Sequence, residues 1–158
     1  VRTIEVLVYL GVTVLLGGAL IGTFLSLDTT LLRNKTEREL TDAANISLER
    51  MVRAIRSAES VNTGLSTFVT SPGVLTVAEA GTTTSFFLSG GDLMLSVNGV
   101  TIGPLTNDTV TVNNLVFTHY TGSTTDMVRI ALTLSAITKA SSSTRTFYGS
   151  AVLRGSYE

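Results

Sequence analysis

The chain has 158 residues, which is enough for one domain and an additional element but too few for two full domains. Hydrophobic residues make up 44% and charged residues only 15%, against about a quarter charged in a soluble domain, so the chain is membrane-associated or concentrates its apolar residues in one segment. A net charge of −1 argues against a general nucleic-acid binder, and the absence of cysteine excludes disulfides, thiol catalysis, iron–sulfur clusters and the common zinc sites.

The first segment is strongly apolar. No charged residue lies between Val6 and Leu27, a run of 22 residues that would be about 33 Å long as a helix. Because the hydrocarbon core of a bilayer is about 30 Å thick, the run predicts a membrane-spanning helix. A secretory signal has a shorter apolar core followed by a small-residue cleavage site, which this run lacks. Since the chain begins with Val1 instead of Met, we expect that residues upstream were removed or are missing from the sequence.

The second segment, residues 28–60, carries six acidic and six basic side chains. Its apolar residues recur at steps of three and four, which places them on one helical face. They are Leu40, Ala44, Leu48, Met51, Ile55 and Ala58. Glu49 with Arg53, and Arg38 with Asp42, have the spacing of ion pairs along a helix. The pattern predicts an amphipathic helix with one face packed on another part of the chain.

The two helical segments are expected to form one rod. No Gly or Pro lies between Thr23 and Asn62, so a continuous helix of about 55–60 residues and roughly 85 Å is predicted. The alternative is a capping box formed by Thr36 and Glu39, which would start a new helix near residue 36.

The third segment, residues 61–158, holds nine charged residues and is rich in Thr, Ser, Gly and Val. Stretches of alternating or β-branched residues predict short strands. They are Leu65–Thr70, Val74–Ala78, Thr84–Leu88, Leu93–Val97, Val110–Val112, Leu115–Tyr120, Val128–Leu134 and Arg145–Leu153. We therefore expect an α+β fold in three parts, residues 1–27, 28–60 and 61–158. In that fold a long N-terminal α-helix packs against a C-terminal head that is one antiparallel β-sheet.

Turn residues separate these strands. Asn98-Gly99 is a strong signal for a two-residue hairpin turn. Gly90-Gly91-Asp92 and Asn113-Asn114 also predict turns. Between the turns, Val128, Ile130, Leu132 and Leu134 occupy alternate positions, so that strand should bury one face.

Glu5 is the most informative single residue, because it stands at the start of the apolar run. A carboxylate at membrane depth costs roughly 2.5 kcal/mol or more near the helix centre, so it normally has a cationic partner. Three arrangements are open. Glu5 lies in the headgroup layer without a partner, or pairs with Arg2 three residues earlier, or meets the α-amino group of Val1 on a neighbouring copy.

The stretch from Val1 to Gly11, VRTIEVLVYLG, resembles the mature N terminus of bacterial type IV pilins and pseudopilins. The shared features are a processed first residue, Glu at position 5, a long apolar helix without another charge, an amphipathic half and a β head. This resemblance covers the order of segments along the whole chain.

The resemblance implies a structural role and no enzymatic activity. A prepilin peptidase would cut a leader before Val1 and methylate the new amine, and inner-membrane assembly machinery would add the subunit to a helical homo-oligomer. Glu5 would neutralise the amine of a neighbouring subunit. The membrane helices would bundle in the filament core through apolar residues, for which we select Val6, Leu7, Leu10, Val14, Leu15, Leu20, Ile21 and Phe24. The subunit would begin in the inner membrane and end in an extracellular pilus.

Three positions depart from that family. Residue 1 is Val where Phe is usual, and residue 2 is Arg where a small polar or apolar residue is usual. The proline often found near position 22 is missing, and Gly17, Gly18 and Gly22 occupy that zone. Each Gly costs a helix about 1 kcal/mol relative to Ala, so the zone is expected either to melt in a filament or to allow close helix packing through Gly18-x-x-x-Gly22.

Other candidate sites are weaker. His119 has no second His and no acidic neighbour at ligand spacing, so it is interpreted as a strand residue. No phosphate-binding loop, calcium loop or Ser–His–Asp set is found, and no metal or cofactor is expected. Arg50, Arg53 and Arg56 form a basic strip. Pairing with acids or neighbouring subunits is the favoured interpretation of this strip, and DNA binding the less favoured one.

The sequence thus predicts a filament subunit of the type IV pilin kind, and motility, adhesion, DNA uptake and secretion all stay open as the role of that filament. A major pilin is favoured over the alternative, a minor pilin or pseudopilin of a secretion or DNA-uptake system. A monomeric membrane-anchored β domain that binds an extracellular ligand is the competing hypothesis, and it gives Glu5 no role.

Overall fold

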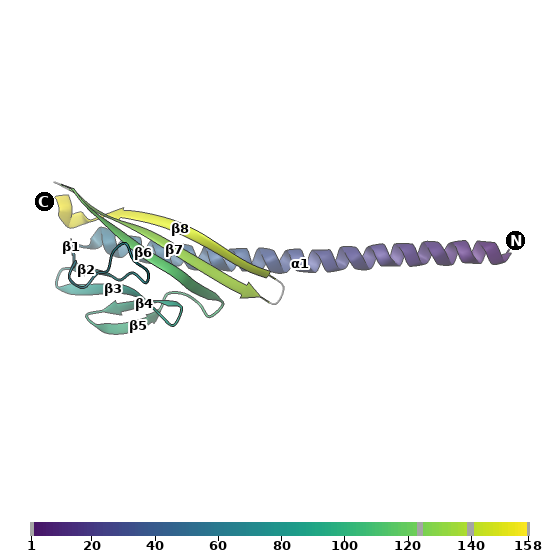
Figure 1. Cartoon of the computed structure of the whole chain (residues 1–158), viewed down its shortest axis with the longest axis horizontal. Coiled ribbons are helices and arrows are strands. Elements are labelled where there is room, and N and C mark those ends of the chain that lie inside the picture. Colours follow the sequence, from purple (N-terminus) through teal and green to yellow (C-terminus); the bar gives the residue numbers. More distant parts are fainter. Residues whose placement is uncertain (1, 123–124, 139–140, 158) are drawn as a thin grey trace.

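A computed structural model of the chain describes residues 2–122, 125–138 and 141–157. It begins with a single helix, α1 (Arg2–Ser57), of 56 residues, about 84 Å long at about 1.5 Å per residue. The predicted continuous rod is confirmed (Figure 1). The alternative helix start near residue 36 is wrong, because Thr36 lies within the helix and is fully buried there.

The C-terminal half of α1 packs on the head through the predicted apolar face. Five of the six predicted positions are fully buried, namely Leu40, Ala44, Met51 and Ile55 on α1 and Ala58 directly after it. The sixth, Leu48, is partly buried against the same core. Glu49 and Arg53 form the expected ion pair at 2.6 Å on the solvent side. Arg38 and Asp42 are not among the ion pairs of the described residues, where Lys35 pairs with Glu39 at 3.8 Å instead.

The head begins with a five-stranded antiparallel sheet whose strands follow chain order. They are β1 (Ser60–Val61), β2 (Leu75–Glu79), β3 (Thr82–Ser89), β4 (Asp92–Val97) and β5 (Val100–Pro104). The Asn98-Gly99 hairpin is confirmed, since both residues have positive φ, 50° and 79°, as a two-residue primed turn requires. Gly90 and Gly91 form the turn between β3 and β4, as expected.

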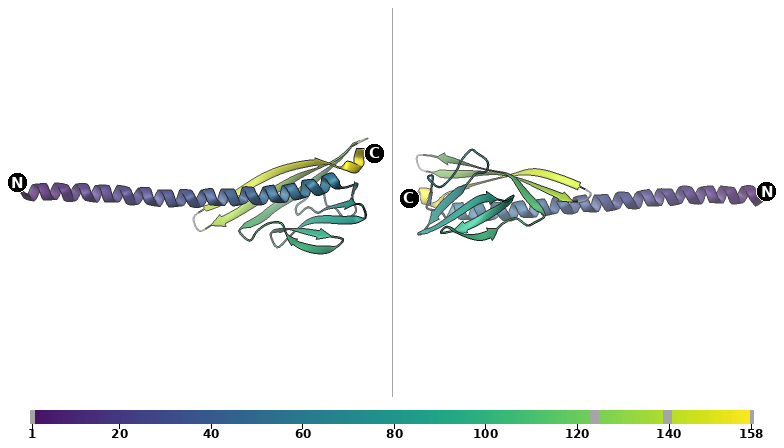
Figure 2. Two further views of the ribbon diagram at one scale, coloured as in Figure 1. Left: turned by 180° about the vertical axis from the view of Figure 1, so that it is seen from behind. Right: turned by 60° about the horizontal axis from the view of Figure 1, so that its bottom comes forward.

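A second antiparallel sheet contains β6 (Val110–Thr121), β7 (Asp126–Thr138) and β8 (Ser141–Val152), followed by the short 3-10 helix η1 (Arg154–Tyr157). The expectation of a single sheet of short strands is therefore wrong. The strands of this second sheet have 12, 13 and 12 residues. Figures 1 and 2 show this sheet lying along the C-terminal half of α1, while the rest of α1 projects alone.

Two local predictions also fail. Asn113-Asn114 does not form a turn but lies within β6, where the register with β7 shifts between Val112 and Asn114. A bulge there absorbs one extra residue and the ladder continues on both sides. Residues 65–70 are loop, with one isolated bridge between Thr67 and Val74. This loop continues to Val74, and the whole 65–74 loop packs against the edge of β6 through hydrogen bonds from Val69 N to Phe117 O and from Gly73 N to Leu115 O, both 2.8 Å.

The core lies between α1 and the two sheets. The alternation predicted for β7 is confirmed, because Val128, Ile130, Leu132 and Leu134 are all fully buried. Phe86 from the first sheet and Phe117 from β6 are the largest fully buried side chains. One hydrophobic cluster therefore connects the helix to both sheets and fixes the head on the C-terminal half of α1.

Candidate assembly site

The uncovered half of α1 is an apolar rod. The stretch Arg2–Phe24 has 23 residues with a mean hydropathy of 2.2, and none of its most apolar window is buried. By length and composition it is a helix that could cross a membrane. The eight residues selected for a filament core all lie on it with their side chains exposed: Val6, Leu7, Leu10, Val14, Leu15, Leu20, Ile21 and Phe24. Each exposed side chain of this size costs roughly 1.5–3 kcal/mol in water, so the rod requires an apolar environment.

The hydroxyl groups within this rod are satisfied by the helix itself. Thr13 Oγ1 donates to Tyr9 O at 2.8 Å, and Thr23 Oγ1 donates to Ala19 O at 2.9 Å. Such bonds remove the cost of placing a hydroxyl in a medium without water. These two threonines are therefore compatible with an apolar surrounding and need no outside partner.

Glu5 differs from these threonines. Its side chain is exposed, and among the residues that the structure describes no cationic nitrogen lies within 4 Å of its carboxylate. The intrachain pair with Arg2 that the sequence left open is thus not formed. Val1, the other predicted partner, lies outside the described residues. Glu5 is a carboxylate at the end of an apolar rod without a described partner.

The three glycines of the rod have no role in the fold of the single chain. The helix is unbroken across Gly17, Gly18 and Gly22. A Cβ added at any of them would meet nothing within 4 Å. Because each Gly weakens a helix by about 1 kcal/mol relative to Ala, the chain carries a cost here that its own packing does not explain. Melting in a filament and close packing between helices both remain predictions.

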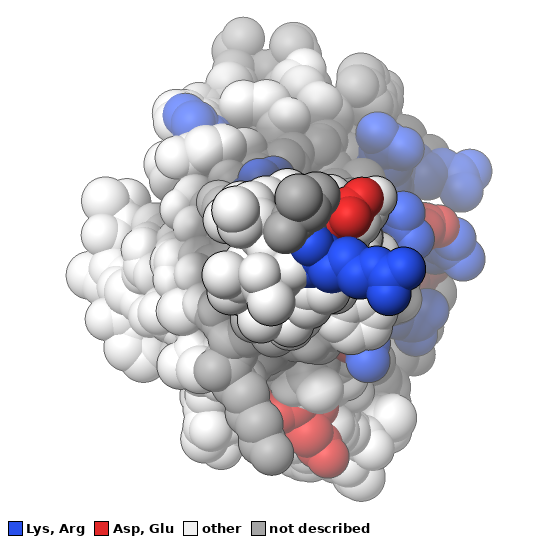
Figure 3. All heavy atoms as spheres, turned by 90° about the vertical axis from the view of Figure 1, so that its right-hand side faces the viewer, with Lys and Arg blue, Asp and Glu red and all other residues white. Residues whose placement is uncertain are grey.

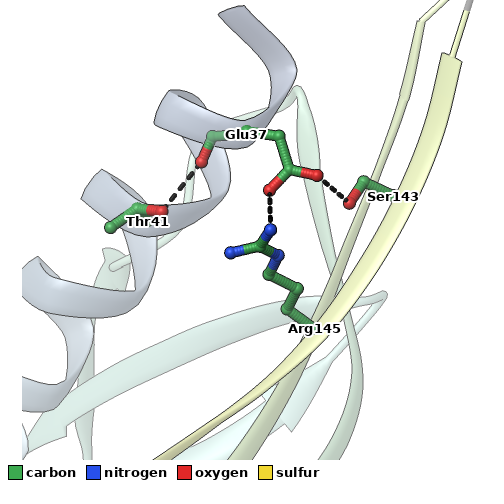
Figure 4. Close-up of polar contacts among 4 residues, drawn as sticks. All are labelled: Glu37, Thr41, Ser143 and Arg145. Carbon is green, nitrogen blue, oxygen red and sulfur yellow. Dashed lines mark hydrogen bonds and ion pairs between the residues drawn. The ribbon is translucent and has the colours of Figure 1, made fainter. Parts of the chain in front are cut away.

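A polar clamp joins α1 to the head at the end nearest the rod (Figure 4). Ser143 Oγ donates to Glu37 Oε1 at 2.8 Å, and Arg145 Nη2 lies 2.7 Å from Glu37 Oε2. The contact between Arg145 and Oε2 is therefore an ion pair, and Oε2 accepts no hydrogen bond from the described residues. Thr41 Oγ1 donates to Glu37 O at 2.8 Å and supports the same helical turn. Sequence reasoning missed this clamp, because its partners are far apart in the chain.

His119 has an acidic neighbour that the sequence did not reveal. It lies on β6, 11% exposed, with Nε2 3.5 Å from Asp126 Oδ2 on β7 and its ring stacked on Phe68 at 5.4 Å. Antiparallel pairing of β6 and β7 brings the two residues together. The described residues contain no group of three His, Cys, Asp or Glu side chains that would hold a metal ion.

The basic strip on α1 is exposed but mixed in charge. Arg50, Arg53 and Arg56 all face solvent, and Arg53 is neutralised by Glu49. Figure 3, viewed from the N-terminal end of α1, shows Lys and Arg gathered mainly on one side of the molecule. Acidic side chains lie among them. The strip therefore suits pairwise contacts better than a continuous anionic polymer.

An open depression of about 540 Å³ lies at the far end of the head, lined by Ser57, Glu59, Glu79 and Arg154 among others. Ser57 Oγ donates to Glu79 Oε2 at 2.8 Å. The sequence did not predict a pocket on the head. Its two acids and one arginine leave little net charge to select a ligand.

The chain was compared with family models, curated proteins and solved structures, and none of them matches. Its function is therefore inferred from its own residues and geometry.

Proposed function

We propose that the chain is a structural subunit of a type IV pilus-like extracellular filament and has no enzymatic activity. The observation that carries this proposal is Glu5, an acid without a described partner at the end of an apolar rod that the head leaves uncovered. A filament supplies both missing elements, an apolar surrounding for the rod and a cation for the acid.

In the proposed mechanism the rod first anchors the subunit in the inner membrane. When assembly machinery extracts the subunit, the same apolar surface is reburied against the rods of other subunits, so lipid contacts are exchanged for protein contacts. Glu5 then pairs with the α-amino group of Val1 on the adjacent subunit. This pairing favours one axial register, because any other register buries an uncompensated charge.

Processing follows from the same scheme. A prepilin peptidase would expose the amine of Val1 and methylate it, and an external motor would drive extrusion. A minor pilin or pseudopilin of a secretion or DNA-uptake system would use the same rod and the same Glu5. A monomeric anchored domain, in contrast, leaves Glu5 without a partner.

The decisive experiment replaces Glu5 in cells that make the protein. Glu5→Gln keeps the shape and removes the charge, and Glu49→Gln is the matched control on the same helix, because Glu49 is 70% exposed and paired locally with Arg53. Surface filaments are counted by electron microscopy of sheared material, and membrane insertion is followed by carbonate extraction. Glu5→Gln should lower the filament count at least tenfold with insertion unchanged, while Glu49→Gln should have little effect. Undiminished filaments with Glu5→Gln would defeat the proposal.

A further inference from the structure

We propose that the heads of neighbouring copies join edge to edge, with β8 of one copy pairing with β5 of the next as antiparallel strands. This inference rests on the proposed function, because it requires copies whose rods point in the same direction. It adds a second contact, between heads, to the contact between rods.

The first observation is that β8 is a long, unprotected edge strand. It pairs with β7 over twelve consecutive residues without a bulge, and no described backbone group makes a hydrogen bond to its other side. Ser142, Thr144, Thr146, Tyr148 and Ser150 are exposed along it. Natural sheets block such edges with Pro, charged side chains, bulges, or a covering helix or loop. β8 has no Pro, Lys or bulge between Ser141 and Val152, and its one charged side chain, Arg145, is paired with Glu37.

The opposite edge of the same sheet is protected. Two hydrogen bonds from the 65–74 loop cover β6 at Phe117 and Leu115, and Val112 N donates to Gly91 O at 2.7 Å. Further protection comes from the bulge near Asn114. The contrast between the two edges of one sheet indicates that β8 is kept open for a partner.

The first sheet has two edges, β1 with two residues and β5 with five, and only β5 is long enough to pair along a strand. It pairs with β4 on one side, and its other side has no hydrogen bond among the described backbone groups. Val100 and Ile102 have 65% and 64% of their surface exposed. Ile102 is the extra residue where the register with β4 shifts, and Pro104 ends the strand, so the edge open to a partner is short. Apolar side chains beside an open edge are what an added strand would cover.

Strand direction agrees with this choice of partner. β8 begins beside the clamp at Glu37, through Ser143, and runs away from the rod. β4 begins beside the start of β6, where Val112 bonds to Gly91, and also runs away from the rod, so β5 returns toward it. Figures 1 and 2 show β8 and β5 on opposite sides of the head. Two copies with parallel rods therefore present antiparallel strands to each other.

Pairing of β8 with β8 is excluded by the same geometry. Two copies of one edge pair as antiparallel strands around a two-fold axis, which would point the two rods in opposite directions. Pairing of β8 with β5 is heterologous, so it forms a ring if the rotation between copies closes and an open helical assembly if it does not. The proposed filament is the open case. Charge does not oppose it, because the one charged residue in the two strands, Arg145, is paired with Glu37.

Cross-linking tests the contact directly, because the chain has no cysteine of its own. Ile102→Cys on β5 is combined in turn with Thr144→Cys, Thr146→Cys or Tyr148→Cys on β8, and a short bismaleimide is added to sheared filaments of the full chain. Three positions are used because the register between copies is not fixed by one chain. At least one pair should give a ladder of dimers, trimers and higher species, and each single variant should give monomers.

A second variant tests whether the contact matters for assembly. Ile102→Lys places a charge at the contact and should lower the filament count several-fold. The control is Leu65→Lys, on a loop outside both strands. Leu65 is 63% exposed and Ile102 is 64% exposed, and Leu65→Lys should leave the filament count unchanged. A full filament count with Ile102→Lys would overturn the contact.

The remaining outcomes are also decisive. If the double-cysteine variants form filaments in normal number but none of the three pairs gives a ladder, the head contact is overturned and the proposed function still stands. Dimers from a single β8 cysteine show self-pairing of β8 and overturn it as well. Cells that make the protein but form no filament containing it defeat the proposed function, and the head contact with it.

Discussion

Glu37 on α1 and Arg145 on β8 form an ion pair at 2.7 Å where the head ends and the uncovered rod begins. The large apolar side chains of α1 up to Phe24 are exposed, and from Leu40 onward its apolar face is covered by the sheets. The clamp therefore marks the boundary between the segment that needs an outside partner and the segment that the chain packs itself.

Removing the clamp should loosen the head on the helix. Glu37→Ala breaks the contacts to Ser143 and Arg145, and Glu37 is only 25% exposed, so unfolding of the head should become easier by about 1–2 kcal/mol. Glu49→Ala removes an ion pair that is about 70% exposed and should cost about 0.5 kcal/mol or less. Urea titration of the full chain in detergent, followed by circular dichroism, compares the two. Equal costs would show that the clamp contributes no more than a surface pair.

The packing of β7 against α1 makes a second prediction. Leu132 is fully buried beneath the helix, and Leu132→Ala should destabilise the head by about 2–5 kcal/mol through lost burial and the cavity left behind. Ile137 lies on the same strand but is 77% exposed, so Ile137→Ala should stay within about 0.5 kcal/mol. The same titration measures both. A loss of stability below about 1 kcal/mol for Leu132→Ala would contradict the packing of this strand in the core.

The sequence predicted those parts of the fold that local patterns encode. Steps of three and four from Leu40 to Ala58 identified the buried helix face, and alternation from Val128 to Leu134 identified a buried strand face. The Asn98-Gly99 turn followed from backbone sterics alone, since both residues tolerate positive φ.

Features that depend on distant partners were not predictable. Ser143 and Glu37 are 106 positions apart, and no spacing rule connects a helix to a strand at that separation. The division into two sheets was missed for the same reason, because alternation predicts a strand but not its neighbour. Asn113 is a residue type that suits either a turn or a β-bulge. The structure has a bulge there, because β6 pairs with β7 on both sides of this position.

The hairpin turn between β4 and β5 gives a third prediction. Gly99 has φ of 79° and a Cβ added there would meet nothing within 4 Å, so Gly99→Ala is strained by backbone conformation and not by contact. A loss of about 1–2 kcal/mol is expected, since left-handed backbone is costly for residues with a Cβ. Gly64 has no positive φ and only an ordinary contact to Asn62 at 3.5 Å, so Gly64→Ala is the matched control and should be near neutral. Thermal unfolding of both variants distinguishes them.

The glycine zone of the rod makes the final prediction. Replacing Gly17, Gly18 and Gly22 with Ala meets no obstacle inside the chain and strengthens the isolated helix by about 1 kcal/mol per site. Membrane insertion should therefore be retained, while the filament count should fall, because both the melting and the close-packing roles need residues without a Cβ. Gly11→Ala is the control, since Gly11 is equally open but stands alone on the rod.

A high-resolution filament map then separates the two roles of the glycine zone, melting and close packing. Broken helical hydrogen bonds between about residues 17 and 23 identify melting, and a continuous helix with neighbouring backbones close to Gly18 and Gly22 identifies packing. An undiminished filament count with the triple replacement would contradict both.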